Sequence, residues 1–219
     1  MKAPAGKIPD PLVFRVGLTG GIATGKSLVA EVFREEGAFV LDTDVLGHEL
    51  MEPGAPAYQE ILDRFGDAIL APDGRIDRKK LGERVFGDER ARLQLNAILH
   101  PRILAEAEQR VGRFARQNPG GIAVTQAALM AEAGAFGRFD RIVLTECDPS
   151  TQLLRLRARD GLGEEEALRR IGAQADSAAR RRIAHMVLDT SGSLEETRAK
   201  ARQVFESLRR EWESRKAAQ

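Results

Sequence analysis

The chain has 219 residues, with 34 Lys and Arg against 33 Asp and Glu, a formal net charge of +1 and one cysteine. This length fits one large domain, or a domain with an inserted lobe. The balanced charge gives no global field, which argues against a protein that coats nucleic acid or binds a membrane surface. Because a lone cysteine cannot form a disulfide within one chain, a reducing cytoplasm is the expected location.

The beginning of the chain indicates a βαβ unit that follows a flexible arm. Residues 1–11 contain three prolines and no apolar run, so they resemble a loose arm and not a secretion signal. The apolar run of residues 12–18 stops at a glycine pair and predicts a buried strand. Apolar residues at helical spacing then run to Gly37, and residues 38–41 predict a second, parallel strand.

The middle of the chain has a different pattern, typical of helices. Residues 53–117 predict a helical lobe inserted into the α/β domain, and we expect Pro101 to end or kink its last helix. Beyond a loop at residues 118–121, two short strands and an arginine-rich helical segment at residues 151–185 are expected. A last short strand at residues 186–188 and a helix at residues 194–215 close the chain.

This alternation predicts an α/β fold of three layers, with a parallel sheet flanked by helices. We expect residues 12–52 and 118–219 to form its core. The longest stretch without Asp, Glu, Lys or Arg is residues 117–131, which is too short and too polar to span a bilayer.

A phosphate-binding loop follows the first predicted strand. Gly20-Gly21-Ile22-Ala23-Thr24-Gly25-Lys26-Ser27 matches G-x-x-x-x-G-K-[ST] between a strand and a helix, as the motif requires. The residues expected to bind ATP are Gly21, Ile22, Ala23, Thr24, Gly25, Lys26, Ser27 and Leu28. Backbone N–H groups and the helix dipole would hold the phosphates, Lys26 would reach the β- and γ-phosphates, and Ser27 would be a ligand of Mg²⁺.

The rest of the chain distinguishes among the classes of P-loop protein. It has neither the Asn-Lys-x-Asp motif with which GTPases read guanine nor an LSGGQ signature of transporter ATPases. Asp42 and Asp44 directly follow the second predicted strand, where the carboxyl ends of parallel strands share one crevice. A carboxylate there could orient an acceptor hydroxyl, as in a small-molecule kinase. Equally, either Asp could cap the helix that follows.

Arginine is concentrated between Arg155 and Arg182, with eight arginines against five acidic residues. On a mobile helical segment, arginines can close over a triphosphate and neutralise the transferring phosphoryl group. A solvated helix face is the common alternative, and Arg157, Arg180 and Arg181 are assigned to it here.

The chain resembles the dephospho-coenzyme A kinases over roughly residues 13–205. The matching segments are Gly17-Leu18-Thr19-Gly20-Gly21-Ile22, Leu41-Asp42-Thr43-Asp44, Glu52-Pro53-Gly54-Ala55-Pro56-Ala57-Tyr58, Phe65-Gly66, Asp73-Gly74-Arg75-Ile76-Asp77-Arg78 and Leu95-Asn96-Ala97-Ile98-Leu99-His100-Pro101, with Gln152-Leu153, Arg155, Arg159-Asp160 and Gln174 farther on. The resemblance implies a P-loop core, an inserted coenzyme-A-binding lobe, a helical lid, and ATP-dependent phosphorylation of the ribose 3′-hydroxyl of dephospho-coenzyme A with Mg²⁺. The balanced charge leads us to expect no nucleic-acid or membrane partner, and we expect a monomer or a weak homo-oligomer.

The resemblance also assigns roles to individual residues. Asp44 is implied as the acceptor-side catalytic carboxylate, and Arg159 as the lid arginine that clamps the γ-phosphate. Asp42 is implied on the substrate side, in a role that supports Asp44 or binds a water of the metal ion. His100 is implied to contact the substrate, although a structural hydrogen-bonding role is equally open. Glu132 is implied to contact the acceptor.

Some positions depart from the family pattern and keep other functions open. Ala128-Leu129-Met130-Ala131-Glu132 replaces P-L-L-F-E, and Asp189-Thr190-Ser191-Gly192 replaces D-N-N-G. A kinase for another nucleoside or nucleotide acceptor is therefore the main alternative. A nucleotide-binding protein without catalysis is the other, although it would not need the acceptor carboxylate.

Overall fold

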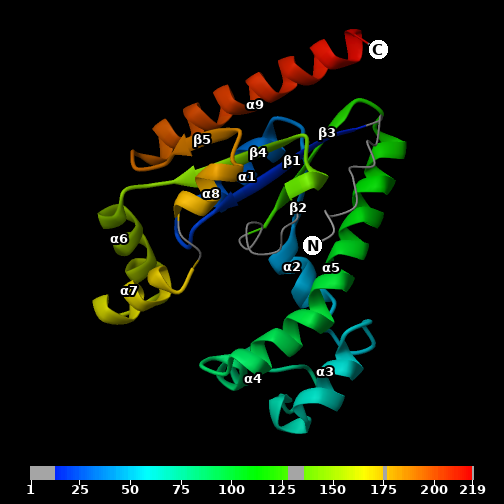
Figure 1. Ribbon diagram of the computed structural model, residues 1–219, viewed down its shortest axis with the longest axis vertical. Coiled ribbons are helices and arrows are strands. Elements are labelled where there is room, and N and C mark those ends of the chain that lie inside the picture. The colour runs from blue at the N-terminus through cyan, green and yellow to red at the C-terminus, as the bar shows by residue number, and fades with distance from the viewer. Residues whose placement is uncertain (1–12, 128–135, 175–176, 219) are drawn as a thin grey trace. The chain divides into compact units, whose positions relative to one another are not determined.

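A computed structural model describes residues 13–127, 136–174 and 177–218. The predicted N-terminal arm lies outside these residues. The chain divides into two compact units, one formed by the chain up to Leu41 together with Phe114 onward, and the other by Asp42–Arg113. Each unit is described by itself below, and Figure 1 labels the elements of both.

The first unit is built on five strands, β1 (Val13–Gly20), β2 (Phe39–Asp42), β3 (Gly121–Gln126), β4 (Arg141–Glu146) and β5 (Met186–Asp189). They form one sheet in the order β2-β3-β1-β4-β5. The described pairings are parallel, with Val16 opposite Val124 and Leu18 opposite Val143. The expected parallel sheet flanked by helices is confirmed, and each predicted strand overlaps an observed one.

Helices of the first unit flank this sheet: α1 (Lys26–Glu35), α6 (Pro149–Asp160), α7 (Glu164–Gly172), α8 (Ser177–Ile183) and α9 (Leu194–Ala217), with the short 3₁₀ turn η2 (Phe136–Arg138). Side chains of β1, α1 and α9 share one core, and α9 runs beside the sheet in Figure 1. Phe14 of β1 stacks on Trp212 of α9 with ring centroids 5.5 Å apart, and Phe33 of α1 meets Phe205 at 5.3 Å. Such aromatic pairs add to the stability that burial gives.

Local sequence explains why these helices begin where they do. Asp148 caps α6 by accepting from the Thr151 N–H, with Pro149 at the first helical position. Ser193 and Glu196 form a reciprocal capping box at the start of α9. Both caps follow a strand of the sheet directly, so they fix the loops at the carboxyl ends of β4 and β5.

The second unit contains α2 (Thr43–Glu49), α3 (Tyr58–Phe65), the 3₁₀ turn η1 (Asp67–Ile69), α4 (Arg78–Val85) and most of α5 (Glu89–Gln117). Asp77 caps α4 by accepting from the N–H groups of Lys79 and Lys80. Throughout the described ranges, every helix is too short or too polar to cross a membrane.

The sequence led us to expect that Pro101 would end or kink its helix. It does not end the helix, since α5 continues past Pro101 to Gln117. Proline lacks an N–H and leaves one helical carbonyl without its usual donor. The neighbouring Arg102 adds a donor in the same turn, since its Nη1 lies 2.6 Å from the Ile98 carbonyl oxygen. Arg102 also reaches the Pro56 carbonyl at 3.2 Å and pairs with Glu60, so contacts outside the helix stabilise this turn.

Candidate active site

The phosphate loop joins β1 to α1, and two of its residues have a left-handed backbone conformation. Gly25 has φ +80° and Ala23 has φ +58°, the one non-glycine residue with positive φ among those described. An alanine in this conformation is strained, and such strain persists where the surroundings fix the backbone. Turns of this kind direct successive N–H groups into one hollow that binds anions. Because α1 begins at Lys26, its dipole adds positive potential there.

Lys26 reaches back along the loop. Its Nζ donates to the carbonyl oxygens of Gly20 at 2.8 Å and Gly21 at 2.7 Å, which holds the half-buried ammonium group against the loop. The next residue, Ser27, is exposed in the first turn of α1. A cation and a hydroxyl are thus adjacent at the helix terminus, a suitable pair for a phosphate and its metal ion.

Hydrogen bonds of buried threonines hold the backbone of the phosphate loop in place. Thr24 Oγ1 donates to the Gly21 carbonyl at 2.9 Å and lies 2.9 Å from Thr145 Oγ1 at the end of β4. Thr190, after β5, donates to the Thr24 carbonyl at 3.0 Å. A Cβ at Gly20 would lie only 2.6 Å from the Thr145 carbonyl oxygen, so the crowding permits only glycine there.

Two glutamines hold the loop from the side of the arginine-rich helices. Gln152 of α6 donates through Nε2 to the Ile22 carbonyl at 2.8 Å. Gln174, just after α7, accepts from the Ile22 N–H through Oε1 at 2.7 Å. The conformation of the phosphate loop is therefore connected directly to the helical segment that was expected to form a lid.

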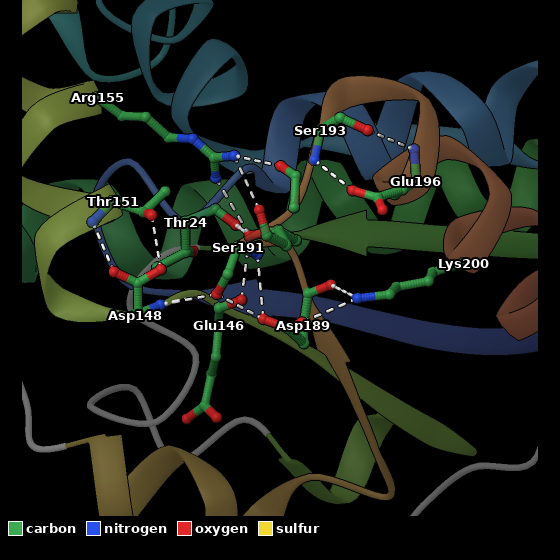
Figure 2. Close-up of polar contacts among 12 residues, drawn as sticks. Thr24, Glu146, Asp148, Thr151, Arg155, Asp189, Ser191, Ser193, Glu196 and Lys200 are labelled. Carbon is green, nitrogen blue, oxygen red and sulfur yellow. Dashed lines mark hydrogen bonds and ion pairs between the residues drawn. The ribbon is translucent and has the colours of Figure 1, made fainter.

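The loops after β4 and β5 form a polar network, which Figure 2 shows in detail. Ser191 Oγ accepts from the Asp148 N–H at 2.9 Å and donates to Asp189 at 2.7 Å. Hydrogen bonds from Ser150 and Thr151 hold the pKa of Asp148 well below its usual range. Hydrogen bonds from Lys200 and Ser191 lower the pKa of Asp189 to about 2. Both groups are therefore carboxylates at neutral pH.

A cavity of about 500 Å³ lies at this edge of the sheet. Its lining residues are Gly21, Thr24, Leu144, Thr145, Glu146, Cys147, Asp148, Pro149, Gln152, Ser177, Arg180, Arg181, Val187 and Asp189. Burial raises the pKa of the Cys147 thiol, so this cysteine is protonated at neutral pH. The cavity meets the phosphate loop at Gly21 and Thr24, so a ligand of the loop could extend into it.

The arginines of this segment have different environments. Arg159 is exposed and donates to both carboxylate oxygens of its neighbour Asp160, at 2.7 and 3.0 Å, and this contact raises the pKa of Arg159. Arg157 and Arg181 are exposed and pair with Glu164 and Glu146, as expected for a solvated face. The same expectation is wrong for Arg180, which is only 5% exposed and lies beside the phosphate loop. The sequence shows it as one of three consecutive arginines, with nothing to mark it as buried.

Three of the residues expected on the acceptor side, Asp42, Asp44 and His100, belong to the second unit. Asp42 is the N-cap of α2, because its Oδ1 accepts from the N–H of Asp44 at 2.8 Å and of Val45 at 3.3 Å. The capping alternative is thus correct for Asp42, whereas Asp44 is exposed in the first helical turn. His100 is half-buried inside α5 and not at a helix end. Glu132 lies outside the described residues.

Comparison with known proteins identifies the family. The profile of the family described as "Dephospho-CoA kinase" matches residues 14–196. A dephospho-CoA kinase of Moorella thermoacetica is 44% identical over 198 residues, covering 90% of this chain and 93% of that protein. One of Thermobifida fusca is 41% identical over 203 residues, covering 93% and 100%.

Solved structures share the fold of this chain. A crystal structure from Thermus thermophilus matches with a TM-score of 0.76 and 30% identity, covering 90% of this chain and 98% of that one. A shikimate kinase from Bacteroides thetaiotaomicron, at 15% identity and a TM-score of 0.53, covers 89% and 98% and shares the fold alone. The phosphate loop, the parallel sheet and the match over residues 14–196 lead to one conclusion: this chain belongs to the dephospho-CoA kinase family.

Proposed function

We propose that this protein transfers the γ-phosphoryl group of ATP to the ribose 3′-hydroxyl of dephospho-coenzyme A, the last step of coenzyme A synthesis. The observation that carries the proposal is the braced phosphate loop, with Lys26 Nζ held by the Gly20 and Gly21 carbonyls, in a chain of this family. Phosphoryl transfer passes through a loose transition state, so alignment and charge stabilisation provide most of the catalysis.

The nucleotide side is formed by the loop. The N–H groups of Gly21 to Leu28 would hold the phosphates, and Lys26 would stabilise charge on the β- and γ-phosphates. No cluster of three His, Cys, Asp or Glu side chains that could hold a metal ion occurs in the described ranges. The exposed Ser27 hydroxyl nevertheless fits Mg²⁺ that enters with the nucleotide, because this ion takes few protein ligands and keeps phosphate oxygens and water. When bound, the ion would neutralise charge on the phosphates.

The acceptor side depends on Asp44. An exposed carboxylate in the first turn of α2 could hydrogen-bond the 3′-hydroxyl, orient it and accept its proton late in the reaction. Asp42 would support it by fixing the helix start. His100 and Glu132 would contact the acceptor, and residues 53–117 would form the lobe that binds it.

Residues 151–185 would act as the lid. Water competes with the acceptor for the γ-phosphate, so closure should come before chemistry. Arg159 would then leave Asp160 and clamp the γ-phosphate. We place this activity in the cytoplasm, in a monomer or weak homo-oligomer.

The test is ADP release by the full chain with Mg²⁺ and ATP and a panel of acceptors: dephospho-coenzyme A, adenosine, AMP and shikimate. We expect turnover only with dephospho-coenzyme A, and a product that carries a 3′-phosphate by mass spectrometry and phosphorus NMR. Faster turnover with another acceptor would make the protein a different kinase. ATP binding without ADP release for any acceptor would make it a binding protein.

A further inference from the structure

Arg180 is a buried cation for which the described residues provide no counter-ion. The residue is only 5% exposed, and its Nε is a buried donor without a hydrogen-bond partner. Its Nη2 lies 3.5 Å from Gln174 Oε1, at the outer limit for a hydrogen bond. Within the described part of the chain, no carboxylate pairs with it, although its neighbour Arg181 pairs with Glu146.

A buried guanidinium without a paired carboxylate lowers the stability of the folded protein. A guanidinium group cannot lose its proton at neutral pH, and a buried charge is costly unless it is paired and hydrogen-bonded. Removing an unpaired cation from this position should therefore cost little stability, and a bound anion should be strongly favoured there.

The guanidinium faces the phosphate loop. Arg180 lines the same cavity as Gly21 and Thr24, and its Nη1 would lie 3.5 Å from a Cβ placed on Gly21. The lack of a side chain at Gly21 leaves the guanidinium close to the loop backbone. A group bound by the loop amides would thus lie within reach of Arg180, whereas Arg159 is exposed and engaged with Asp160.

Gln174 indicates what kind of ligand fits. Its Oε1 accepts from the Ile22 N–H of the loop at 2.7 Å and lies 3.5 Å from Arg180 Nη2. One oxygen therefore lies where a loop amide and the buried guanidinium converge. A phosphate oxygen has the same acceptor character, with the charge that an amide lacks, and arginine binds phosphate through two parallel N–H groups.

We propose that Arg180 is a phosphate-binding residue of the triphosphate site, and that its guanidinium moves from Gln174 to a phosphate oxygen when the nucleotide binds. The proposal rests on the proposed function and adds a second arginine to the site. Arg180 would bind phosphate in the ground state, and Arg159 would act only on closure. The neighbouring Arg182 is exposed and does not line the cavity, so it provides a matched control on the same helix.

The test compares wild type, Arg180→Met, Arg180→Lys and Arg182→Met in the full chain. Calorimetry would measure the Kd of Mg²⁺-ATP and of Mg²⁺-tripolyphosphate, a probe without a nucleoside. We expect Arg180→Met to weaken both at least about tenfold, Arg180→Lys to weaken both less because it keeps the charge, and Arg182→Met to change neither by more than about twofold. Without added nucleotide, the Tm of the Arg180→Met variant should equal or exceed the Tm of wild type. Addition of ATP should raise the Tm of this variant less than it raises the Tm of wild type.

Two results would overturn the proposal. A purely structural Arg180 would give an Arg180→Met protein with a lower Tm but unchanged Kd values for both probes. A residue that binds only the nucleoside would weaken ATP and leave tripolyphosphate unaffected. Failure of the proposed kinase activity gives a separate result, since wild type and Arg182→Met would then release no ADP with dephospho-coenzyme A while the Kd values remained measurable.

Discussion

The hydroxyl of Thr190 lies 3.0 Å from the carbonyl oxygen of Thr24, so the loop after the last strand holds the phosphate loop directly. Thr190 is fully buried, and its methyl carbon lies 3.5 Å from a Cβ placed on Gly25. Arg155 of α6 donates to the Thr190 carbonyl at 2.8 Å. The phosphate loop, the loop after β5 and helix α6 are therefore connected through Thr190.

Replacing this hydroxyl should weaken both the fold and the nucleotide site. Thr190→Val keeps the shape but leaves the buried Thr24 carbonyl without its donor, which should lower the free energy of unfolding by about 1–3 kcal/mol. The Kd for ATP should rise because the loop is less well held. Urea denaturation and calorimetry would measure the two effects. Thr190→Ser is the control, since it keeps the hydroxyl, and equal stability of Thr190→Val and wild type would contradict the bracing role.

Lys26 should be required for turnover. Lys26→Met removes the cation proposed to face the phosphates, and we expect kcat for ADP release to fall about 10²–10³-fold, as for the loss of one charge-stabilising donor in a transition state. Steady-state kinetics with saturating ATP would measure it. Lys216→Met, at the end of α9, should keep wild-type kinetics. The role of Lys26 would be disproved by a variant that folds and retains wild-type kcat.

Substitutions of Asp42, the last residue of β2, and of Asp44 in α2 should have different effects. Asp44→Asn should reduce kcat about 10²–10⁴-fold through the loss of the proposed general base, while the Kd for ATP stays within about twofold of wild type. Asp42→Asn should keep the fold because asparagine is an equally good N-cap, whereas Asp42→Ala should cost about 0.5–2 kcal/mol of stability. Kinetics and chemical denaturation measure these effects separately. Wild-type turnover by Asp44→Asn would remove Asp44 from the mechanism.

The sequence predicts those features of the fold that depend on local pattern. The strands follow from short apolar runs, the first of which stops at the glycine pair of the phosphate loop. Helix α9 begins at a capping box within its own sequence. The start of α1 at Lys26 is likewise local, because Gly25 provides the left-handed turn before it.

Features that depend on tertiary contacts could not be predicted. Arg180 is buried beside the phosphate loop, where its Nη1 lies near Gly21 from a distant part of the chain, and no periodicity within α8 indicates this. The contacts among the threonines that hold the phosphate loop could not be predicted either. Thr24, Thr145 and Thr190 meet only because parallel strands bring their carboxyl ends to one edge. Arg102 likewise stabilises the turn at Pro101 through contacts with another helix.

His185 should make the stability depend on pH near neutrality. Its Nδ1 accepts from the N–H of the buried Ile142 at 3.1 Å, which requires an unprotonated nitrogen. Partial burial and the nearby Arg141 lower its pKa. Below its ordinary pKa of about 6.5, the unfolded chain binds the proton more readily than the folded protein, so stability falls as the pH drops from 7.5 through the lowered pKa.

The matched variant for this effect is His185→Asn, whose side-chain oxygen can accept the same hydrogen bond without titrating. The Tm of wild type should fall between pH 7.5 and 5.5, and the Tm of the His185→Asn variant should fall less over the same interval. The other two histidines of the chain are present in both proteins and cancel in the difference. The carboxylates Asp148 and Asp189, whose lowered pKa values make their stabilisation disappear only in strong acid, lie outside this window. Parallel Tm profiles for the two proteins would show that the proton is taken up elsewhere.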